Sequence, residues 1–550
     1  MKVKWTMLGL VVFFLLSVVM TCCFVWQYRM PKLQTEETET QAVTEMCPRF
    51  PEPVALKHPI TPLRVALEKV DLLLRSSVHT TRLPALSAIL VLNDSVLWNG
   101  NFGKRNISDP SSSAPNEYTV YRIASLSKIF PTLMLYKLWE SGLVDSLDDP
   151  LDKYTDNFTI KNPLGGPGPA GAPRGRSPAL TLRRMASQLS GLPRRLRSTN
   201  LLWSGDTQAA LGLLQDDVLV ADPGTKCHYS NVAFSLLAGV LAPKVAGSDF
   251  ESWVSRNILE RLGMEDTGFE LTAAVQRQMA VGVYGGGQPA PLYDLGWYRP
   301  AGQMYSTTAD MAKLMMALLG AYGGGVLRRD TLDTMLRPVM RCHAGYFANS
   351  TGTPWEVNRQ FGYDVVRKDG DLDGFAATMA LVPRLKLGLV VLMAGVRPDR
   401  DLAGQAFRHL IPVVEDAFRS ARRAVRAPPD PAPYVGFFTY RNMTFYQIKA
   451  DAQRALLMQQ FGPQVDSSVP LKYRTIRLDY LQDRVFRVVF ESPYPCQMKI
   501  NRSSVSLEAQ DGQLFNFFPF NKKGLSPGFD SPGLNTYRVM RIAGRPFFTS

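Results

Sequence analysis

The sequence predicts an α+β fold, in which strands occur early and late in the chain and helices lie between them. Residues 86–102 hold two apolar runs joined by a turn, which predicts a hairpin. Residues 125–143 and 232–245 repeat apolar side chains at helical spacing. Residues 375–382 and 387–396 are apolar runs separated by a short basic turn, which indicates two adjoining strands. This pattern alone does not give the order of the strands.

The length of 550 residues indicates more than one domain. After residue 433 the chain consists of short β-like stretches, for which we expect a small barrel or sandwich. The predicted parts are a transmembrane signal anchor in residues 1–29, a polar stalk in 30–60, a main domain in 61–426 with a flexible insertion at 162–179, a proline-rich linker at 427–433 and a β-rich domain at 434–550.

The N-terminal part runs from Trp5 to Trp26 without a charged residue, which is long enough to span a bilayer of about 30 Å. A cleaved signal peptide is the alternative, but its apolar region is usually about 7–15 residues before a small-x-small site. We therefore favour an uncleaved anchor. Candidate glycosylation sites all follow it and predict a type II protein with a lumenal or extracellular catalytic part: Asn93, Asn106, Asn157, Asn349, Asn442 and Asn501.

The cysteines, histidines and charged residues limit the kinds of site that the chain is expected to form. Cys47, Cys227, Cys342 and Cys496 allow three disulfide pairings, among which the sequence does not choose. The five histidines have no metal-ligand spacing, so we expect neither a metal nor another cofactor. The net charge is +14, and residues 161–200 hold eight basic and no acidic residues. That stretch is either a solvated loop or an anion-attracting rim, and nothing resembles a nucleic-acid-binding module.

Three short motifs follow one another along the chain: Ser125-Leu126-Ser127-Lys128, Tyr229-Ser230-Asn231 and Lys368-Asp369-Gly370. Together they supply a serine nucleophile, a lysine one helical turn away, a tyrosine next to an amide, and a second lysine. These groups are sufficient for an active-site serine enzyme that uses neither histidine nor a metal. A Ser-x-x-Lys pattern occurs by chance about twice in a chain of this length, so the prediction depends on all three motifs.

The context of each motif resembles one family. Residues 121–128 are similar to the nucleophile helix of serine beta-lactamases, in their class C and penicillin-binding-protein (peptidase S12) branch. Residues 223–226 and Gly374-Phe375 resemble segments of the same family. The resemblance covers roughly residues 61–425 and extends to the vertebrate beta-lactamase-like membrane proteins. It implies an antiparallel sheet covered by helices, a helical lobe with the site between them, and a β-rich tail.

The candidate catalytic residues are Ser125, Lys128, Tyr229 and Lys368. Ser125 and Lys128 are three residues apart, so on a helix both side chains lie on one face. A desolvated lysine near a second cation has a lowered pKa, which would let Lys128 accept the serine proton while Lys368 supplies the second charge. Tyr229 would relay protons to the leaving group. As structural alternatives, Ser125 could be a helix cap and Tyr229 part of an ordinary turn.

The candidate substrate-binding groups are Asn231, Gly370 and Asp371. Asn231 would hold Lys128 and a substrate amide. The start of the nucleophile helix would place a backbone N–H group beside the developing oxyanion. The resemblance implies that the second oxyanion donor is the backbone N–H of Asp371, next to Gly370.

Several residues depart from the family pattern. Asp369, Asp371 and Asp373 crowd the third motif, where relatives more often carry small or hydroxyl residues. An acidic side chain at position 371 would repel the carboxylate of beta-lactams and acyl-D-alanine peptides, so we expect weak beta-lactam turnover. Gln188 stands where relatives often have a histidine. Pro131 would remove a helical hydrogen bond and kink the helix behind the site.

The sequence therefore favours a membrane-anchored serine hydrolase that acts on a small-molecule, lipid or peptide ester or amide through an acyl-enzyme. The alternative is an inactive relative that binds an acyl or peptide ligand, or a protein partner, in the same cleft. A surface protein that works through its β-rich tail is a third possibility. The sequence does not decide whether hydrolysis or acyl transfer dominates. It also does not give the oligomeric state.

Overall fold

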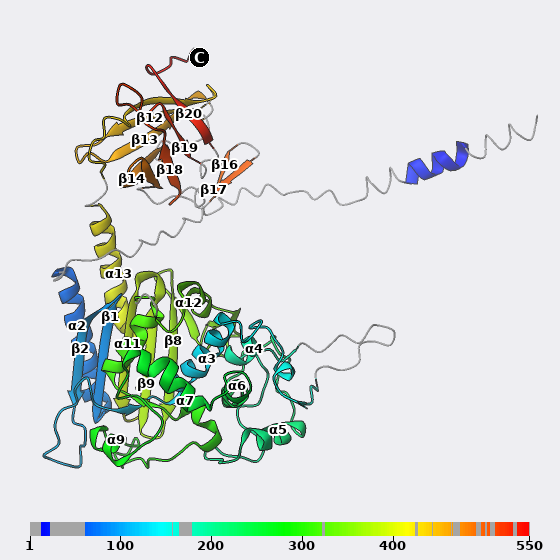
Figure 1. The fold of residues 1–550 in the computed structure, drawn as a ribbon, viewed down its shortest axis with the longest axis vertical. Coiled ribbons are helices and arrows are strands. Elements are labelled where there is room, and N and C mark those ends of the chain that lie inside the picture. Colours follow the sequence, from blue (N-terminus) through cyan, green and yellow to red (C-terminus); the bar gives the residue numbers. More distant parts are fainter. Residues whose placement is uncertain are drawn as a thin grey trace, which may run out of the picture. The chain divides into compact units, whose positions relative to one another are not determined.

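A computed structural model describes thirteen segments of the chain and divides it into two compact units, one of residues 50–425 and one that contains residues 426–550 (Figure 1). The described segments are residues 13–22, 61–156, 158–163, 179–321, 325–423, 427–442, 444–463, 465, 473–490, 497–500, 503–506, 512–531 and 536–548. The predicted stalk and most of the predicted insertion lie outside them. Of the predicted anchor, only residues 13–22 are described, and they are helical.

The larger unit is built on one eight-stranded antiparallel sheet with the strand order β2-β1-β10-β9-β8-β7-β6-β5. The early hairpin β1–β2 thus joins the late strands through the pairing of β1 with β10, and the nucleophile motif lies in the chain between them. The strands are β1 (Ala85–Leu92), β2 (Ser95–Gly103), β5 (Met340–Arg341), β6 (Ser350–Thr351), β7 (Glu356–Gln360), β8 (Tyr363–Leu372), β9 (Phe375–Val382) and β10 (Leu387–Ala394).

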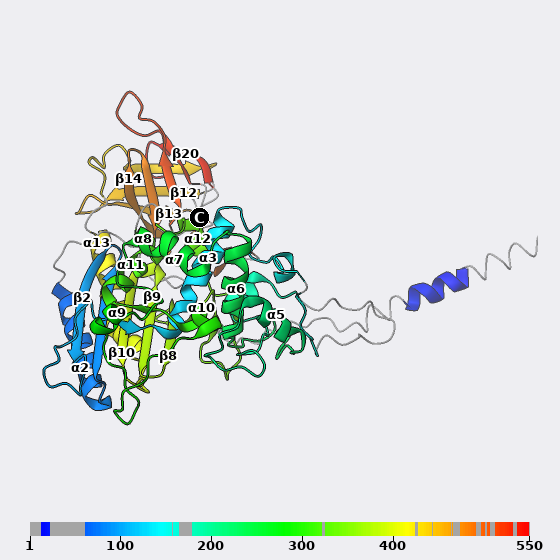
Figure 2. The ribbon, with the colours of Figure 1, turned by 60° about the horizontal axis from the view of Figure 1, so that its bottom comes forward.

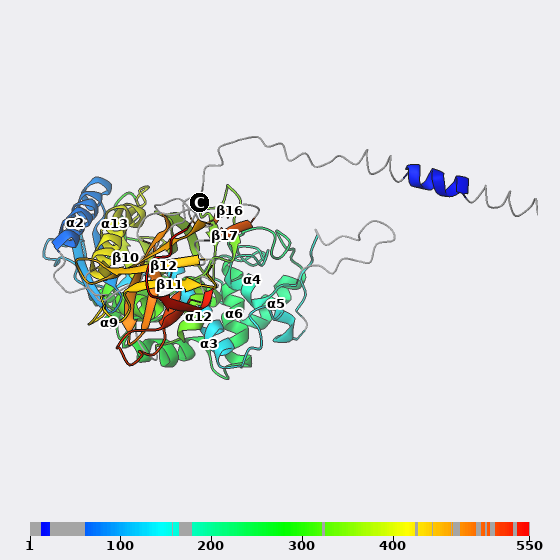
Figure 3. The same ribbon diagram turned by 90° about the horizontal axis from the view of Figure 1, so that it is seen from above.

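Helices cover both faces of the sheet, which explains why its central strands are apolar throughout. Every residue of β1, β9 and β10 is buried. Alternate side chains along each strand point to opposite faces and join two separate cores. Helices α2 (Thr61–Thr81) and α13 (Leu402–Arg423) lie side by side on one face, whereas α11 (Thr308–Leu318) covers the other (Figure 1, Figure 3).

The middle of the chain forms a helical lobe on the α11 side of the sheet, where α3, α6 and α10 lie together (Figure 2). Its elements are η1 (Ala124–Lys128), α3 (Ile129–Glu140), η2 (Leu151–Lys153), α4 (Leu182–Ala186), α5 (Thr207–Gln215), α6 (Asn231–Lys244), α7 (Phe250–Val254), η3 (Ser255–Leu259), α8 (Glu260–Leu262), α9 (Ala273–Gln278), η4 (Gly296–Tyr298), α10 (Arg299–Gly302) and α12 (Arg329–Met335). The short strands β3 (Tyr121–Arg122) and β4 (Tyr305–Ser306) pair beside it.

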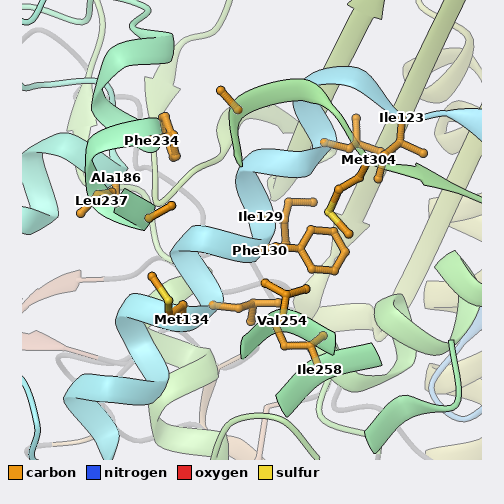
Figure 4. Packing of buried hydrophobic residues seen from close by; sticks show 14 of the residues in the cluster. Ile123, Ile129, Phe130, Met134, Ala186, Phe234, Leu237, Val254, Ile258 and Met304 are labelled. Carbon is orange, nitrogen blue, oxygen red and sulfur yellow. The ribbon is translucent and has the colours of Figure 1, made fainter. Parts of the chain in front are cut away.

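The helix behind the nucleophile is fixed by an apolar cluster. Phe130 and Met134 of α3 belong to the same apolar cluster as Phe234 of α6 and as Val254 and Ile258 after it (Figure 4). All five side chains are fully buried. Since closely packed interiors deform little, this cluster holds η1 and α6 in a fixed relation.

The smaller unit is a closed antiparallel barrel with an aromatic core. Phe438, Tyr446, Phe515, Phe517 and Phe529 are fully buried in it. Its strands are β11 (Gly436–Tyr440), β12 (Thr444–Ala450), β13 (Leu456–Phe461), β14 (Thr475–Gln482), β15 (Val485–Val489), β18 (Leu514–Phe517), β19 (Gly528–Ser531) and β20 (Thr536–Ile542), and β16 (Gln497–Ile500) pairs separately with β17 (Ser503–Ser506).

The predicted fold class is confirmed, as are the predicted hairpin and the strand pair β9–β10. The kink expected from Pro131 is wrong. Pro131 is the third residue of α3, in the first turn, where a backbone N–H has no partner within the helix. The change of geometry occurs earlier, where the 3-10 segment η1 passes into α3.

The central strand β10 gives a test of this core. Leu389→Ala removes a fully buried side chain between β10 and the α2/α13 layer, and should lower the free energy of unfolding by about 2–5 kcal/mol. Leu72→Ala, on the exposed side of α2 (64 % exposed), should change it by less than about 0.5 kcal/mol. Urea unfolding followed by tryptophan fluorescence reports mainly on the larger unit, because six of the eight tryptophans lie in residues 50–425 and none lies in residues 426–550. Equal effects of the two variants would contradict this assignment of the core.

Candidate active site

The nucleophile motif begins with a strained residue. Ala124 has a φ of +47°, a left-handed conformation that a residue with a Cβ rarely adopts. It redirects the chain from β3 into η1 and leaves Ser125 partly exposed between buried neighbours. The second serine of the motif has another role, since Ser127 is fully buried and its Oγ accepts a hydrogen bond from the backbone N–H of Met304 at 3.1 Å. The exposed serine is therefore Ser125.

The structure brings together the first two motifs at Ser125. The Lys128 ammonium donates to Ser125 Oγ at 3.0 Å and to the carbonyl oxygen of Ala301 at 2.7 Å. The Tyr229 hydroxyl donates to the same Ser125 Oγ at 2.6 Å, from a residue 104 positions later in the chain. Ser125 Oγ thus lies between two groups that exchange protons.

The two buried lysines have different electrostatic surroundings. Burial is the main cause that lowers the pKa of Lys128 to about 8, and the charge of Lys368 lowers it further, against the attraction of Tyr229. Burial also acts to lower the pKa of Lys368, but its ion pair with Glu356 and the nearby Tyr229 raise that pKa above its ordinary value. Lys368 therefore stays protonated while Lys128 can lose its proton near neutral pH.

Tyr229 lies between these cations. Its ring centroid is 4.8 Å from the Lys128 ammonium and 5.4 Å from the Lys368 ammonium. Burial alone would raise the pKa of Tyr229, but the two lysine charges and hydrogen bonding with Lys128 and Ser125 bring it below its ordinary value. Its hydroxyl is therefore more acidic than that of an exposed tyrosine.

The second motif is held in place by Gln188, a residue that differs from the family pattern. Gln188 is buried with a φ of +60°, and its Oε1 accepts the backbone N–H of Ser230 at 2.7 Å. Ser230 caps α6 through its Oγ, which accepts from Ala233 N at 3.1 Å. Asn231 is the buried first residue of α6, but the expected contact with Lys128 is wrong, because the hydrogen bonds of Lys128 in the described structure go to Ser125 and Ala301.

The third motif approaches the nucleophile through a glycine. A Cβ on Gly370 would lie 2.7 Å from the Ser125 backbone nitrogen and 2.5 Å from the Ile123 carbonyl oxygen, so only glycine lets β8 come this close. The Asp369 N–H points to Glu356 at the end of β7. Since successive N–H groups of a strand point to opposite edges, the Asp371 N–H points to that same edge, beyond the last β7–β8 pair.

The acidic side chains of this strand face away from the nucleophile. Lys368 and Gly370 lie on the face of β8 toward η1, so Asp369 and Asp371 lie on the opposite face. There Arg397 pairs with Asp371 at 2.7 Å and with Asp369 at 3.4 Å, and it also donates to the Gly370 carbonyl oxygen at 3.0 Å. The expectation that the Asp371 carboxylate projects toward a substrate is therefore wrong, because this carboxylate lies on the face of β8 away from Ser125. Asp373, in the following turn, accepts from the Tyr284 hydroxyl at 3.4 Å.

A disulfide connects the second motif to the sheet edge. Of the four cysteines considered, Cys227 pairs with Cys342, and Cys47 and Cys496 lie outside the described residues. Cys342 begins the loop between β5 and β6, and Phe347 of that loop contacts the Tyr229 ring edge-on at 5.9 Å between centroids. The disulfide thus holds an aromatic loop against Tyr229.

The other predicted sites are scattered over the surface. Asn93, Asn349 and Asn442 are exposed and Asn106 is half-buried, whereas Asn157 and Asn501 lie outside the described residues. In the basic stretch, Arg194 is exposed with its guanidinium 5.2 Å from the Tyr229 ring centroid. Within the described segments, no cluster of three or more His, Cys, Asp or Glu is arranged to hold a metal ion.

Three residues that position the site had not been identified as functional. Glu356 pairs with Lys368, the Ala301 carbonyl holds Lys128, and Arg397 neutralises the acidic side of β8. A single glutamate at the start of a strand, or a single arginine after a strand, has no sequence pattern that would identify it as part of a site. Only Ala301 lay in a segment, residues 300–302, that resembles the family.

The chain is similar to known proteins in sequence and in fold. The family model "Beta-lactamase" matches residues 70–411. "Putative beta-lactamase-like 1" of Homo sapiens is 58 % identical over 504 residues, covering 92 % of this chain and all of that protein. The D-alanyl-D-alanine-carboxypeptidase/endopeptidase AmpH of Escherichia coli K12 is 28 % identical over 293 residues, covering 51 % of this chain and 72 % of that protein.

Solved structures show the same fold at lower identity. The octameric penicillin-binding protein homologue from Pyrococcus abyssi is 19 % identical with a TM-score of 0.53, covering 83 % of this chain and 96 % of that one. A class C beta lactamase is 20 % identical with a TM-score of 0.52, covering 65 % of this chain and 99 % of that one. From the family model and the extent of the human relative, the chain belongs to the beta-lactamase family of serine hydrolases.

Proposed function

We propose that the protein is an active serine hydrolase that cleaves an ester or amide through an acyl-enzyme on Ser125. The observation that carries this proposal is the position of Ser125 Oγ, 3.0 Å from the Lys128 ammonium and 2.6 Å from the Tyr229 hydroxyl. These distances are those of a nucleophile in hydrogen-bond contact with its base.

In the acylation step, Ser125 Oγ forms a bond to the substrate carbonyl carbon and passes its proton to neutral Lys128. The bond from that carbon to the leaving oxygen or nitrogen then breaks, and the leaving group takes a proton through Tyr229. Lys368, which stays charged, favours the anionic form of Tyr229 whenever the tyrosine gives up its proton. Water attacks the acyl-enzyme by the reverse proton path.

The carbonyl oxygen becomes negative during both steps and needs donors in place beforehand. The Ser125 backbone N–H and the Asp371 backbone N–H are the two we assign, since Gly370 brings β8 against η1. Both belong to the backbone of rigid elements, so they would require little rearrangement during the reaction.

The substrate class is a small-molecule, lipid or peptide ester or amide. The related Escherichia coli protein is by its name a carboxypeptidase and endopeptidase, which supports acyl-transfer chemistry without fixing the substrate here. We propose poor activity on beta-lactams, because Arg397, the cation next to the third motif, lies on the face of β8 away from Ser125 and is paired there with Asp371 and Asp369. Arg397 is therefore not available to bind a substrate carboxylate, and the carboxylates beside the third motif repel one.

We further propose that the N-terminal segment, Trp5 to Trp26, anchors the protein in a membrane with the catalytic unit on the lumenal or extracellular side. Support comes from the uncharged run itself and from the exposed sequons Asn93, Asn349 and Asn442. In the parts of the chain that the structure describes, none of the helices combines the length and apolar character that crossing a membrane requires.

Covalent labelling tests the proposed function. A fluorophosphonate probe should add once to the full-length chain, as measured by intact mass, and Ser125→Ala should abolish the adduct. Ser127→Ala is the matched control, because Ser127 is buried against Met304 and should leave labelling intact. Absence of an adduct on folded wild-type protein would reject turnover in favour of a ligand-binding protein with the same cleft.

The pH dependence follows from Lys128. A lysine accepts a proton only when neutral, so the labelling rate should rise with pH through an inflection near 8, the value of the Lys128 pKa. Lys368→Met removes a charge that lowers this pKa and should move the inflection to higher pH. Lys244→Met, at the exposed end of α6, should not. Identical inflections in all three proteins would contradict the assignment of Lys128 as base.

The acidic residues of the third motif predict a specific gain of function. Asp371→Ser removes the carboxylate that pairs with Arg397, and with it one negative charge beside the site, so it should raise the rate of acylation by benzylpenicillin by about threefold to tenfold, equivalent to about 0.7–1.4 kcal/mol. Asp373→Ser makes the same change of charge two residues away, where Tyr284 is the contact, and should have a smaller effect. Equal rates for wild type and Asp371→Ser would show that this ion pair does not limit beta-lactams.

A further inference from the structure

The loop between β5 and β6, residues 342–349, is the wall of the site next to Tyr229. Its ends are closed by a hydrogen bond from Cys342 N to the Asn349 carbonyl oxygen at 2.9 Å. The Cys227–Cys342 disulfide joins it to the segment two residues before Tyr229. The loop is therefore fixed to the catalytic motif by a covalent bond.

The aromatic side chains of this loop form a short stack that ends at the catalytic tyrosine. Tyr346 and Phe347 are stacked with centroids 4.1 Å apart, and Phe347 meets the Tyr229 ring edge-on at 5.9 Å. Phe347 nevertheless remains 60 % exposed. One of its faces is thus packed against Tyr346 while apolar surface next to Tyr229 stays open to solvent.

The chemical character of the loop indicates what fits against it. Residues 342–349 contain no Asp, Glu, Lys or Arg. Lys128, Lys368 and Glu356 are buried, and the exposed charged group next to the Tyr229 ring is Arg194, with its guanidinium 5.2 Å from the ring centroid. A substrate whose carbonyl carbon reaches Ser125 would meet polar groups at the reacting bond and the uncharged aromatic surface of the 342–349 loop alongside.

We propose that Phe347 is a specificity-determining residue that packs against the apolar acyl group of the substrate, in a position fixed by the Cys227–Cys342 disulfide. This inference rests on the proposed acyl-enzyme at Ser125 and adds the acyl class to it. The preferred substrates are esters or amides of medium-length apolar acids rather than acetyl compounds. Burying one additional methylene against the ring is worth roughly a factor of four.

Chain-length selectivity of the full-length protein tests the proposal. The ratio of kcat/KM for p-nitrophenyl hexanoate to that for p-nitrophenyl acetate should exceed one in the wild type and fall about tenfold in Phe347→Ala, which is roughly two methylenes of lost contact. Phe361→Ala is the matched control, an equally exposed phenylalanine (54 %) in the β7–β8 turn, and should retain the ratio. The double variant Cys227→Ser/Cys342→Ser should also lower it, because the loop is released.

The outcomes separate this proposal from the proposed function. An unchanged ratio in Phe347→Ala, with normal fluorophosphonate labelling, would overturn the role of Phe347 and would favour a partner-binding role for the exposed ring. If Phe347→Ala does not fold, Phe347→Leu should keep the preference and Phe347→Gln should lose it. If the wild type is not acylated at all, calorimetric binding of hexanamide and acetamide decides instead, and equal affinities would reject the apolar wall.

Discussion

The active site depends on one buried ion pair, between Lys368 and Glu356. Two fully buried lysines lie beside the half-buried Tyr229, and buried charges are costly unless they are paired. Glu356 neutralises Lys368, so the second ammonium keeps its proton. Lys128 is buried with the neutral Ser125 hydroxyl and Ala301 carbonyl as hydrogen-bond acceptors, and burial lowers its pKa to about 8. One carboxylate thereby makes one lysine a fixed cation and the other a base.

The fold holds this pair in place from both sides. Glu356 is the first residue of β7, and Lys368 lies on β8, so their separation is set by a strand pairing rather than by flexible loops. Gly370 then brings β8 against the nucleophile turn, where the strained φ of Ala124 turns Ser125 toward the lysines. Strain of this kind costs about 1–3 kcal/mol and persists only where surrounding packing fixes it. The apolar cluster of α3 and α6 provides that packing.

The sequence predicted the residues that meet at Ser125 better than the residues that hold them in place. Ser125, Lys128 and Tyr229 lie in short motifs at the starts of helices, so their meeting follows once the motifs are identified. Glu356 acts only through a partner on the neighbouring strand, and a lone glutamate in a polar strand has no distinguishing pattern. The orientation of Asp371 was predictable in part. Side chains alternate between the two faces of a strand, so Asp371, three residues after Lys368, lies on the opposite face. That prediction needed the strand boundaries and the position of Arg397, which follows β10.

The interior and the rim of the site differ in how freely they can vary. The pKa of Lys128 depends on Lys368, and the charge of Lys368 depends on Glu356, so replacing any one of these residues alters the other two. Phe347 and Asp371 contact solvent and touch the reacting groups only through Tyr229 or the backbone of β8. Each of them can change without disturbing the proton path. Substrate choice is therefore expected to be encoded at the rim, while the chemistry at Ser125 stays fixed by the buried charges.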